Sequence, residues 1–158
     1  MGCVIMGRKT FDVVKDAEPW AYAKPVMVMS RTLMANKIPK GLMQKTEKGW
    51  LKVEVISGEP MGTMEMVKQR GWKRVYVDGG EVIRNFLREG LVESMVISRV
   101  PVLIGKGVPL SGELGGDVKL VHERTRSWES AVVQSRYRVA KDGEKRDFVS
   151  GKSGINEA

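Results

Sequence analysis

Two glycine turns in this chain have the residue types that bind phosphate. The first, Met6-Gly7-Arg8-Lys9-Thr10, directly follows the apolar run Cys3–Ile5, and the second, Val77-Asp78-Gly79-Gly80-Glu81, directly follows Arg74–Tyr76. A glycine turn leading from a strand into a helix directs unpaired backbone N–H groups and the positive end of the helix dipole at one spot. Two such turns in one α/β chain predict a bound dinucleotide, although either alone could be a plain tight turn.

Ser30 and Arg31 form a third candidate phosphate site, after the apolar run Pro25–Met29. A guanidinium is a planar cation whose donors match a phosphate. An isolated arginine in this position is more often a solvated loop cation. The phosphate interpretation of Arg31 therefore depends on its occurring together with the two glycine turns.

No residue is identified as catalytic or as a metal ligand. Asp78 ends a predicted strand, where a carboxylate more often caps the next helix than acts as a general base. His122, the only histidine, lies among charged residues in a predicted strand, so we expect it to face solvent. The single cysteine, Cys3, excludes an internal disulfide and a cysteine-rich metal site, and we expect it to pack as a small apolar residue.

Strand-like and helix-like segments alternate along most of the chain. Strands are predicted at Cys3–Met6, Pro25–Met29, Val53–Ile56, Arg74–Val77 and Ser94–Val102, and helices at Thr10–Lys15, Met61–Arg70 and Glu81–Glu89. Two longer strands, Val118–Arg126 and Ala131–Ala140, form a predicted hairpin. This order predicts an α/β fold with a mostly parallel central sheet, helices on both faces and a C-terminal antiparallel hairpin at its edge. We expect residues 1–140 to form one domain and the polar residues 141–158 to be a loosely ordered tail.

The composition is that of a globular protein with a basic surface. The 158 residues are 42% hydrophobic and 29% charged, with a formal net charge of +8. No apolar run approaches a membrane span and no signal peptide opens the chain, so we expect a cytoplasmic protein with no membrane partner. Because no nucleic-acid-binding motif is present, we expect anionic small molecules rather than nucleic acid as partners.

The ordered set of motifs resembles the dihydrofolate reductase-like superfamily. It is most similar to the reductase domain of the bifunctional riboflavin-biosynthesis deaminase–reductase and its stand-alone bacterial homologues. The resemblance covers roughly residues 2–140, and its most specific part is the stretch from Gly90 to Leu110. It is carried by Val4–Phe11, Val28–Arg31, Val77–Gly80 with Ile83, Phe86 and Leu87, Gly90–Glu93, Arg99–Leu110, and Ser127 with Val133–Tyr137.

The resemblance implies an NADPH-dependent reductase that transfers hydride to a pyrimidine- or pteridine-like substrate. Gly7 would let the backbone approach the cofactor phosphates. Arg8 and Lys9 would meet the pyrophosphate or the 2′-phosphate, and Thr10 would hydrogen-bond a phosphate from the helix N-terminus. Gly79 and Gly80 would pass under the pyrophosphate, to which the Glu81 and Val82 amides would donate. Ser30 and Arg31 would hold the adenosine 2′-phosphate, which favours NADPH over NADH. Two alternatives are a dihydrofolate reductase and a non-catalytic or truncated NADP-binding module.

The chain departs from these relatives in three ways. Ser111 and Ala131 stand where relatives usually have an aromatic residue and a glycine, respectively. Relatives also carry a strand and a substrate-covering loop before the first glycine turn, and that strand lies between the strands matching Arg74–Val77 and Ser94–Val102. We therefore expect negligible turnover by this chain alone. We also expect the strand position to be filled by closure of its two edges, by a neighbouring chain or by sequence before Met1. Riboflavin-type relatives usually pair, so a homodimer is expected.

Overall fold

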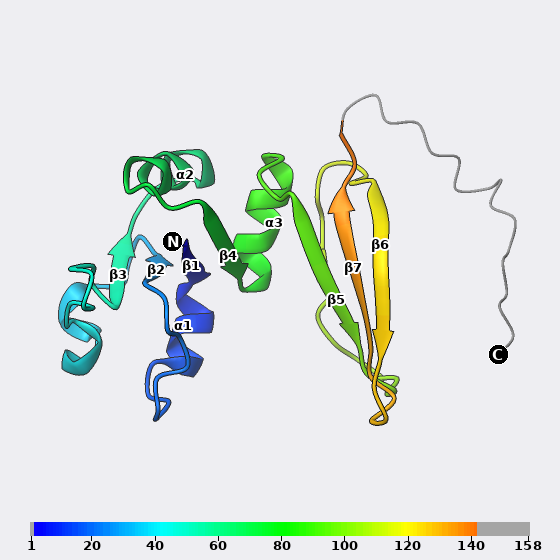
Figure 1. The fold of residues 1–158 in the computed structure, drawn as a ribbon, viewed down its shortest axis with the longest axis horizontal. Coiled ribbons are helices and arrows are strands. Elements are labelled where there is room, and N and C mark those ends of the chain that lie inside the picture. The colour runs from blue at the N-terminus through cyan, green and yellow to red at the C-terminus, as the bar shows by residue number, and fades with distance from the viewer. Residues whose placement is uncertain (1, 142–158) are drawn as a thin grey trace, which may run out of the picture. The chain divides into compact units, whose positions relative to one another are not determined.

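The structure, a computed structural model, describes residues 2–141 and contains two separate β-sheets (Figure 1). Contacts divide the chain into two compact units. Unit 1 runs from the N-terminus to Val92 and includes Leu103–Asp117, whereas unit 2 comprises Glu93–Val102 and the chain from Val118 onward. The predicted tail lies almost entirely outside the described residues. The assignment of residues 1–140 to one domain stays a prediction.

Unit 1 is built on a four-stranded parallel sheet. Its order is β3 (Val53–Ile56), β2 (Val26–Met29), β1 (Gly2–Gly7) and β4 (Arg74–Asp78). The central strand β1 is buried from Gly2 to Met6, as expected for a parallel strand covered on both faces. The sequence prediction of a parallel sheet with strands at these places is therefore confirmed.

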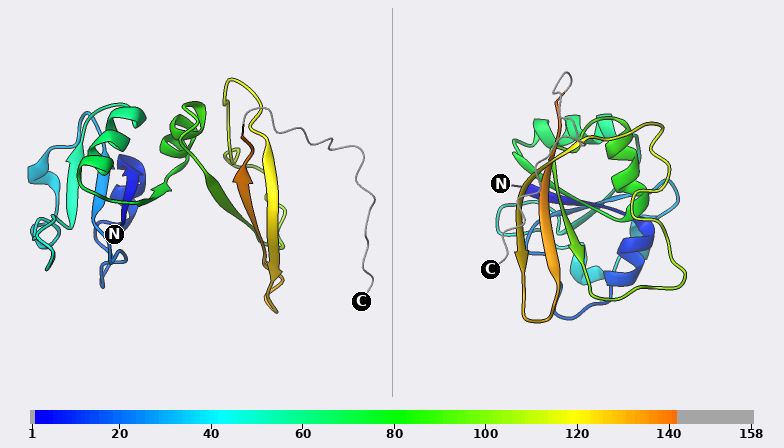
Figure 2. Two further views of the ribbon diagram at one scale, coloured as in Figure 1. Left: turned by 45° about the horizontal axis from the view of Figure 1, so that its top comes forward. Right: turned by 90° about the vertical axis from the view of Figure 1, so that its right-hand side faces the viewer.

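Helices cover both faces of this sheet (Figure 2). Helix α1 (Arg8–Val14) packs on one face through Phe11, together with two short 3-10 turns, η1 (Ala35–Lys37) and η2 (Lys40–Leu42). Helices α2 (Pro60–Gln69) and α3 (Gly80–Arg88) pack on the other. The helices expected from the apolar spacing are present, with their ends shifted by one or two residues.

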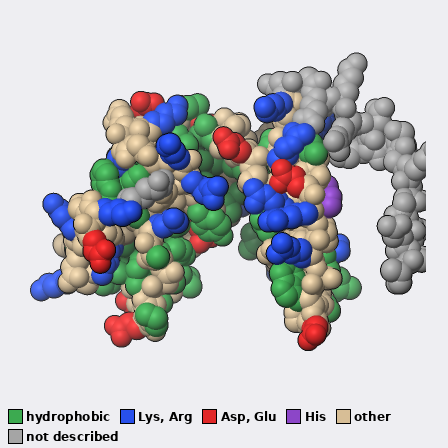
Figure 3. Space-filling model, in the orientation of Figure 1, with side chains coloured by type: hydrophobic (Ala, Val, Ile, Leu, Met, Phe, Trp, Pro, Cys, Tyr) green, Lys and Arg blue, Asp and Glu red, His purple; other side chains and the backbone are tan. Residues whose placement is uncertain are grey.

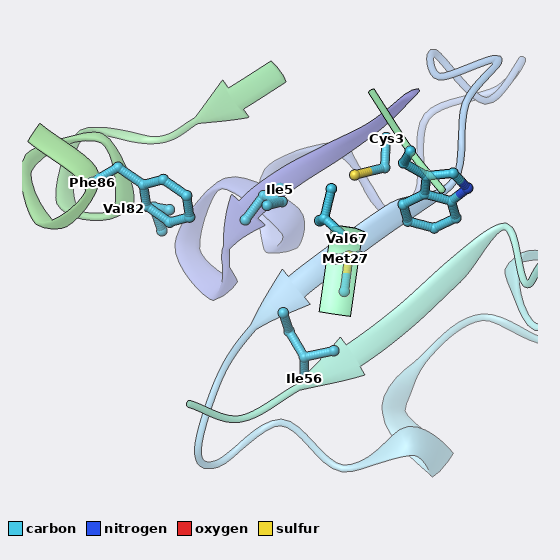
Figure 4. Close-up of a cluster of buried hydrophobic side chains, with 8 residues drawn as sticks. Cys3, Ile5, Met27, Ile56, Val67, Val82 and Phe86 are labelled. Atoms are coloured by element: carbon cyan, nitrogen blue, oxygen red, sulfur yellow. The ribbon is translucent and has the colours of Figure 1, made fainter. Parts of the chain in front are cut away.

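Alternation along β1 assigns its side chains to the two faces. Cys3 and Ile5 join the cluster under α2 and α3, whereas Val4 and Met6 join the cluster over α1. Figure 4 shows the first of these clusters, in which Ile5 lies among side chains from the neighbouring strands and helices. Full burial of each such side chain contributes roughly 1.5–3 kcal/mol, so the two clusters hold the sheet and helices of unit 1 together.

Cys3 behaves as the small apolar residue that the sequence predicted. Its side chain is 1% exposed within the cluster of Figure 4. Burial raises the pKa of its thiol to about 11, only partly offset by the positive charge of Arg70. The thiol is therefore protonated at neutral pH, and Cys3 contributes packing rather than reactivity.

Arg70 joins β3 to the end of α2 beside two tryptophans. Its guanidinium donates to both carboxylate oxygens of Glu54, at 2.7 and 2.9 Å. It also lies 5.2 Å from the ring centre of Trp72 and 5.8 Å from that of Trp50. The bidentate pair raises the pKa of Arg70, and its two side chains are only 20% and 30% exposed. This geometry makes the pair a structural brace of unit 1.

Replacing Arg70 by alanine should destabilise the protein by about 1–3 kcal/mol, because Glu54 would keep a half-buried charge without its partner. Chemical denaturation followed by tryptophan fluorescence measures the change. Lys68→Ala is the matched control, since the Lys68–Glu65 pair is 4.0 Å long and largely exposed and should contribute less than about 1 kcal/mol. Equal losses in the two variants would show that the bidentate pair is not a brace.

Unit 2 is a three-stranded antiparallel sheet. Its order is β5 (Ser94–Arg99), β7 (Val133–Val139) and β6 (Leu120–Ser127). The predicted hairpin is present, but it pairs with β5 in a sheet of its own, so its placement at the edge of the central sheet was wrong. Strand β5 ends three residues earlier than predicted, at Arg99, two residues before Pro101, which lacks an N–H for pairing.

The strands β4 and β5 belong to different sheets. Among the described residues, β4 pairs with β1 alone and β5 with β7 alone. The three expected ways of covering these two edges, by closure on each other, by a neighbouring chain or by sequence before Met1, stay predictions.

The backbone conformation at Ala131 explains why relatives usually have glycine at this position. Ala131 lies in the turn between β6 and β7 with a φ of 58°, a left-handed conformation that glycine adopts without cost. Ala131→Gly should therefore stabilise the protein by about 0.5–1 kcal/mol, after allowance for the extra freedom of glycine in the unfolded chain. Thermal unfolding measures this change. A lower melting temperature for the glycine variant would contradict the conformational argument.

Candidate functional site

The three candidate phosphate-binding segments lie at one edge of the parallel sheet. In the strand register Gly7 is opposite Met29, and Met6 is opposite Asp78. The carboxyl ends of β1, β2 and β4 are therefore level with one another. The residues that follow each strand, which the sequence singled out, meet at this edge.

This edge contains a topological switch point. The connection from β1 through α1 leads to β2 on one side of β1, whereas the connection from β3 through α2 leads to β4 on the other side. The helices of these two connections also cover opposite faces. In open α/β sheets ligands bind outside the carboxyl ends of the strands at such a point. The geometry places the candidate site between the ends of β1 and β4.

The two glycine turns touch each other there. Gly79 has a φ of 90°, and a Cβ atom added to it would lie 2.4 Å from Oγ1 of Thr10 and 3.7 Å from the backbone nitrogen of Gly7. A Cβ on Gly7 would lie 3.1 Å from a methyl group of Val82. The close approach and the positive φ therefore require glycine at position 79, whereas a side chain at position 7 would make a tight contact with Val82.

The helices that begin at these two turns have backbone N–H groups that can donate hydrogen bonds to a ligand. Gly7 precedes α1 and Gly79 precedes α3, and neither helix has a side-chain cap. The first-turn amides of a helix have no acceptor within the helix. Uncapped amides from two turns that lie in contact fit a diphosphate, which requires several donors in a small space. Glu81 places a carboxylate in the first turn of α3, so its backbone amide rather than its side chain suits this purpose.

Arg8 connects the turn after β1 to the turn after β2. Its guanidinium donates to Oγ1 of Thr32 at 2.8 Å and contacts Asp12 at 3.4 Å. Hydrogen bonds from Lys15 and Arg8 lower the pKa of Asp12. The hydroxyl of Ser30 accepts the backbone N–H groups of Leu33, at 2.9 Å, and Thr32, at 3.3 Å. These contacts shape the turn that carries Arg31.

Arg31 and Lys9 are the cations of this edge that remain available. Both are exposed, and within residues 2–141 neither forms an ion pair. Arg8, in contrast, shares its charge with Asp12. Arg31 extends this positive charge to the turn after β2, on the side of β1 away from β4.

Two further residues of the site were not found from the sequence. The Tyr22 hydroxyl donates to one carboxylate oxygen of Asp78 at 3.2 Å, and the other oxygen accepts the backbone N–H of Gly79 at 2.8 Å. Burial raises the pKa of Tyr22, and the nearby charge of Asp78 raises it further. Asp78 therefore orients the second glycine turn, but it does not cap α3, which has no side-chain cap, so the expectation of a capping role was wrong. Tyr22 lies in an irregular segment without a motif that could have pointed to it.

Arg84 is the second such residue. Its guanidinium nitrogen lies 3.4 Å from the position of a Cβ on Gly80, and its side chain lies 2.9 Å from the position of a Cβ on Gly112. The nearby Arg88 donates to the carbonyl of Glu113 at 2.5 Å. The loop Leu103–Asp117 therefore packs on α3 and borders the second glycine turn. In the sequence, Arg84 follows Gly80 by one helical turn, and this spacing could have identified it as a residue of the site.

His122, the other polar candidate, lies on β6 of unit 2. His122 is exposed, as predicted, and its ring donates to or accepts from the Thr125 hydroxyl at 2.7 Å. In the described part of the chain, no three His, Cys, Asp or Glu side chains gather in a way that could hold a metal ion. No helix described between residues 2 and 141 has the length and apolar character to cross a membrane.

Solved structures with a similar fold include three proteins. The putative riboflavin biosynthesis protein from Shewanella sp. PV-4 is 34% identical with a TM-score of 0.75, covering 88% of this chain and 74% of that one. A pyrimidine reductase-like protein from Corynebacterium diphtheriae is 17% identical with a TM-score of 0.67, covering 89% and 76%. The diaminohydroxyphosphoribosylaminopyrimidine deaminase/5-amino-6-(5-phosphoribosylamino)uracil reductase from Thermotoga maritima is 14% identical with a TM-score of 0.64, covering 87% and 45%. The last two support the fold alone.

Curated relatives and a family model agree with this likeness. The uncharacterized protein YwjB of Bacillus subtilis (strain 168) is 31% identical over 67 residues, which are 42% of this chain and 38% of that protein. The uncharacterized protein YyaP of the same strain is 27% identical over 148 residues, which are 85% of this chain and 72% of that protein. The model of the RibD C-terminal domain matches residues 3–134. The chain therefore belongs to the RibD C-terminal domain family, the riboflavin-type branch of the dihydrofolate reductase-like fold that its motifs predicted.

Proposed function

We propose that this chain is an NADPH-dependent reductase domain of the riboflavin-biosynthesis type. The observation that carries the proposal is the contact between the two glycine turns at the switch point of the parallel sheet. It brings two uncapped helix N-termini together where a dinucleotide needs donors for its diphosphate.

The diphosphate would lie between the first turns of α1 and α3. Thr10 would donate through its hydroxyl, and Gly80, Glu81 and Val82 through their backbone amides. Gly7 and Gly79 would leave room for the phosphate oxygens. Arg84, which lies beside Gly80, would add a cation from the next turn of the helix.

The adenosine 2′-phosphate would lie against the turn after β2. The Ser30 hydroxyl already accepts two backbone N–H groups, so its own proton can be donated to a phosphate oxygen. Arg31 would supply a bidentate pair of donors, with Arg8 and Lys9 next to it. A 2′-hydroxyl would use none of this charge, which is why the proposal names NADPH rather than NADH.

When bound, NADPH supplies the hydride, and the chain supplies position and electrostatics. Membership of the RibD C-terminal domain family and the likeness to the putative riboflavin biosynthesis protein from Shewanella sp. PV-4 support a pyrimidine- or pteridine-like substrate class. Asp78 has both carboxylate oxygens in hydrogen bonds, which favours a role in holding the glycine turn. We assign no catalytic residue.

Binding and turnover test the proposal separately. Calorimetry should show tight binding of NADPH, whereas its oxidation with a pyrimidine substrate, followed by the loss of reduced-nicotinamide absorbance, should be negligible for this chain alone and measurable once a preceding strand is supplied. Oxidation with dihydrofolate instead would favour a dihydrofolate reductase. Binding without oxidation even when that strand is supplied would favour a non-catalytic nucleotide-binding module. Failure to bind NADPH would contradict the proposal itself.

A homodimer is part of the proposal. Apolar residues are exposed along the segment that follows β5, including Val102, Ile104 and Val108, at 63%, 72% and 87% exposure. Exposed apolar residues gathered in one segment favour association. Light scattering at micromolar concentration should give twice the monomer mass of 17.6 kDa. A constant monomer mass across that range would refute the dimer.

A further inference from the structure

The antiparallel sheet of unit 2 has one strongly cationic face. The strand register sets Val96, Arg136 and Arg124 side by side in one row across β5, β7 and β6. The next row contains Ser98, Gln134 and Arg126. Residues two apart along a strand share a face, so three arginines from two strands lie together. Figure 3 shows Lys and Arg side chains gathered over this sheet.

These arginines border a common depression. It is lined by Val96, Arg124, Arg126, Gln134 and Arg136, all from the face defined by the two rows. Side chains directly opposite on neighbouring strands have Cβ atoms about 4.5–5.5 Å apart, and diagonal neighbours are about 7–8 Å apart. Arginine side chains at such spacing can converge on a single bound group.

The charge of this cluster is only partly balanced within the protein. The strand β6 has an irregularity between His122 and Arg124, and the intervening Glu123 accepts a hydrogen bond from Arg136 at 2.8 Å. Within residues 2–141, Arg124 and Arg126 form no ion pair. Like charges opposite each other destabilise a sheet, and the three guanidinium groups and one carboxylate leave a net charge of about +2. An anion would relieve this repulsion.

The other face of the same sheet has a different character. It carries Met95, Ile97 and Tyr137, which are half-buried, with Arg99 at its end. The cationic side chains are therefore sorted to one face rather than spread over the sheet. Arg99 provides an internal comparison, since it has the same charge on the same sheet and points to the opposite face.

We propose that the face formed by Arg124, Arg126 and Arg136 binds a phosphate monoester dianion. Such a group carries about −1.5 to −2 charges at neutral pH, which matches the unbalanced charge of the cluster. Its oxygens accept bidentate hydrogen bonds from guanidinium groups. Gln134 donates to the Ser98 hydroxyl at 3.0 Å, which leaves that hydroxyl proton as a further donor. This inference goes beyond the proposed function, because it rests on the antiparallel sheet alone.

Titration of the isotope-labelled chain with ribose 5-phosphate, followed by nuclear magnetic resonance, tests the site. We expect shifts in the resonances of β6 and β7 around Arg124, Arg126 and Arg136, and none with ribose. Arg124→Gln with Arg126→Gln should weaken binding about tenfold or more, whereas Arg99→Gln should leave it unchanged. Circular dichroism verifies that each variant is folded.

Glu123→Gln should change the affinity for phosphate in the opposite direction to the loss of the arginines. It keeps every arginine and removes the internal counter-charge of Arg136, so phosphate binding should become about two- to fivefold tighter. A loss of folding cannot imitate a tighter complex. Unchanged or weaker binding in this variant would overturn the electrostatic argument.

The remaining arms separate the possible sources of the phosphate. Adenosine 2′-phosphate is itself a phosphate monoester, so it should shift the arginine face as ribose 5-phosphate does, and it should shift residues around Arg31 as well if the cofactor proposal is correct. If NADPH bound but ribose 5-phosphate had no effect, this inference would be overturned and the proposed function would stand. If ribose 5-phosphate bound but NADPH did not, the proposed function would be overturned and this inference would stand. Tighter binding of a single-stranded oligonucleotide than of ribose 5-phosphate would show a polyanion surface and contradict a monoester site.

Discussion

Gly79→Ala should destabilise the protein by about 2–4 kcal/mol and remove NADPH binding. The added methyl group would enter a backbone conformation with a φ of 90° and would lie 2.4 Å from Oγ1 of Thr10. Relief requires either movement of the second glycine turn or rotation of the Thr10 hydroxyl away from the candidate phosphate site. Chemical denaturation measures the first effect, and calorimetry with NADPH measures the second.

Gly71→Ala is the matched control for this prediction. Gly71 also has a positive φ, 67°, but no atom lies within 4 Å of an added Cβ. It therefore carries the conformational cost without the collision. A Thr10→Ala change combined with Gly79→Ala should recover on the order of 1 kcal/mol relative to the sum of the two single changes. Equal destabilisation at both glycines, with no coupling to Thr10, would contradict the contact between the two turns.

Arg31→Ala should weaken NADPH binding by about one to two decades and leave NADH binding nearly unchanged. The physical reason is the loss of a charge-assisted contact worth roughly 1.5–3 kcal/mol, made only to the 2′-phosphate. Titration of both cofactors by fluorescence or calorimetry gives the two affinities. Equal losses for NADPH and NADH would show that Arg31 does not distinguish them.

Arg74→Ala is the matched control for Arg31. Arg74 begins β4, at the amino end of the strand, so it lies at the opposite edge of the parallel sheet from Arg31. Its removal lowers the net charge by the same amount without touching the candidate site. If Arg74→Ala weakened NADPH binding as much as Arg31→Ala, the effect would come from overall charge rather than from a specific contact.

Most of the secondary structure of unit 1 could be predicted from local patterns. Cys3–Met6 is a continuous apolar run, which is typical of a parallel strand buried on both faces, and the structure confirms it as β1. Val53–Ile56 has the predicted bounds. The predicted helix ends differ from the observed ones by one or two residues, because local spacing does not determine which residue first leaves the helix. The candidate phosphate-binding segments followed from the same patterns, since each begins where an apolar strand ends.

Local sequence patterns did not predict how the strands of unit 2 pair with one another. The sequence predicted the hairpin of β6 and β7, because a hairpin is formed by neighbouring segments and a turn. It did not show that β5 would pair with β7 in a separate sheet. Sheet membership depends on which distant edges meet, and strand-like sequence is compatible with either arrangement.

The sequence by itself thus determined the family, the parallel α/β core and the positions of the glycine turns. It did so because strands, helices and tight turns each require particular residue types at particular local positions. The tertiary structure alone decided which of these residues touch. Gly79 meets Thr10, Tyr22 meets Asp78, and Arg84 borders Gly80. It also gathered Arg124, Arg126 and Arg136 on one face of a sheet. Two of these four associations join residues more than fifty positions apart, and the arginine face joins separate strands. Such contacts arise from strand order and register, which no local pattern encodes.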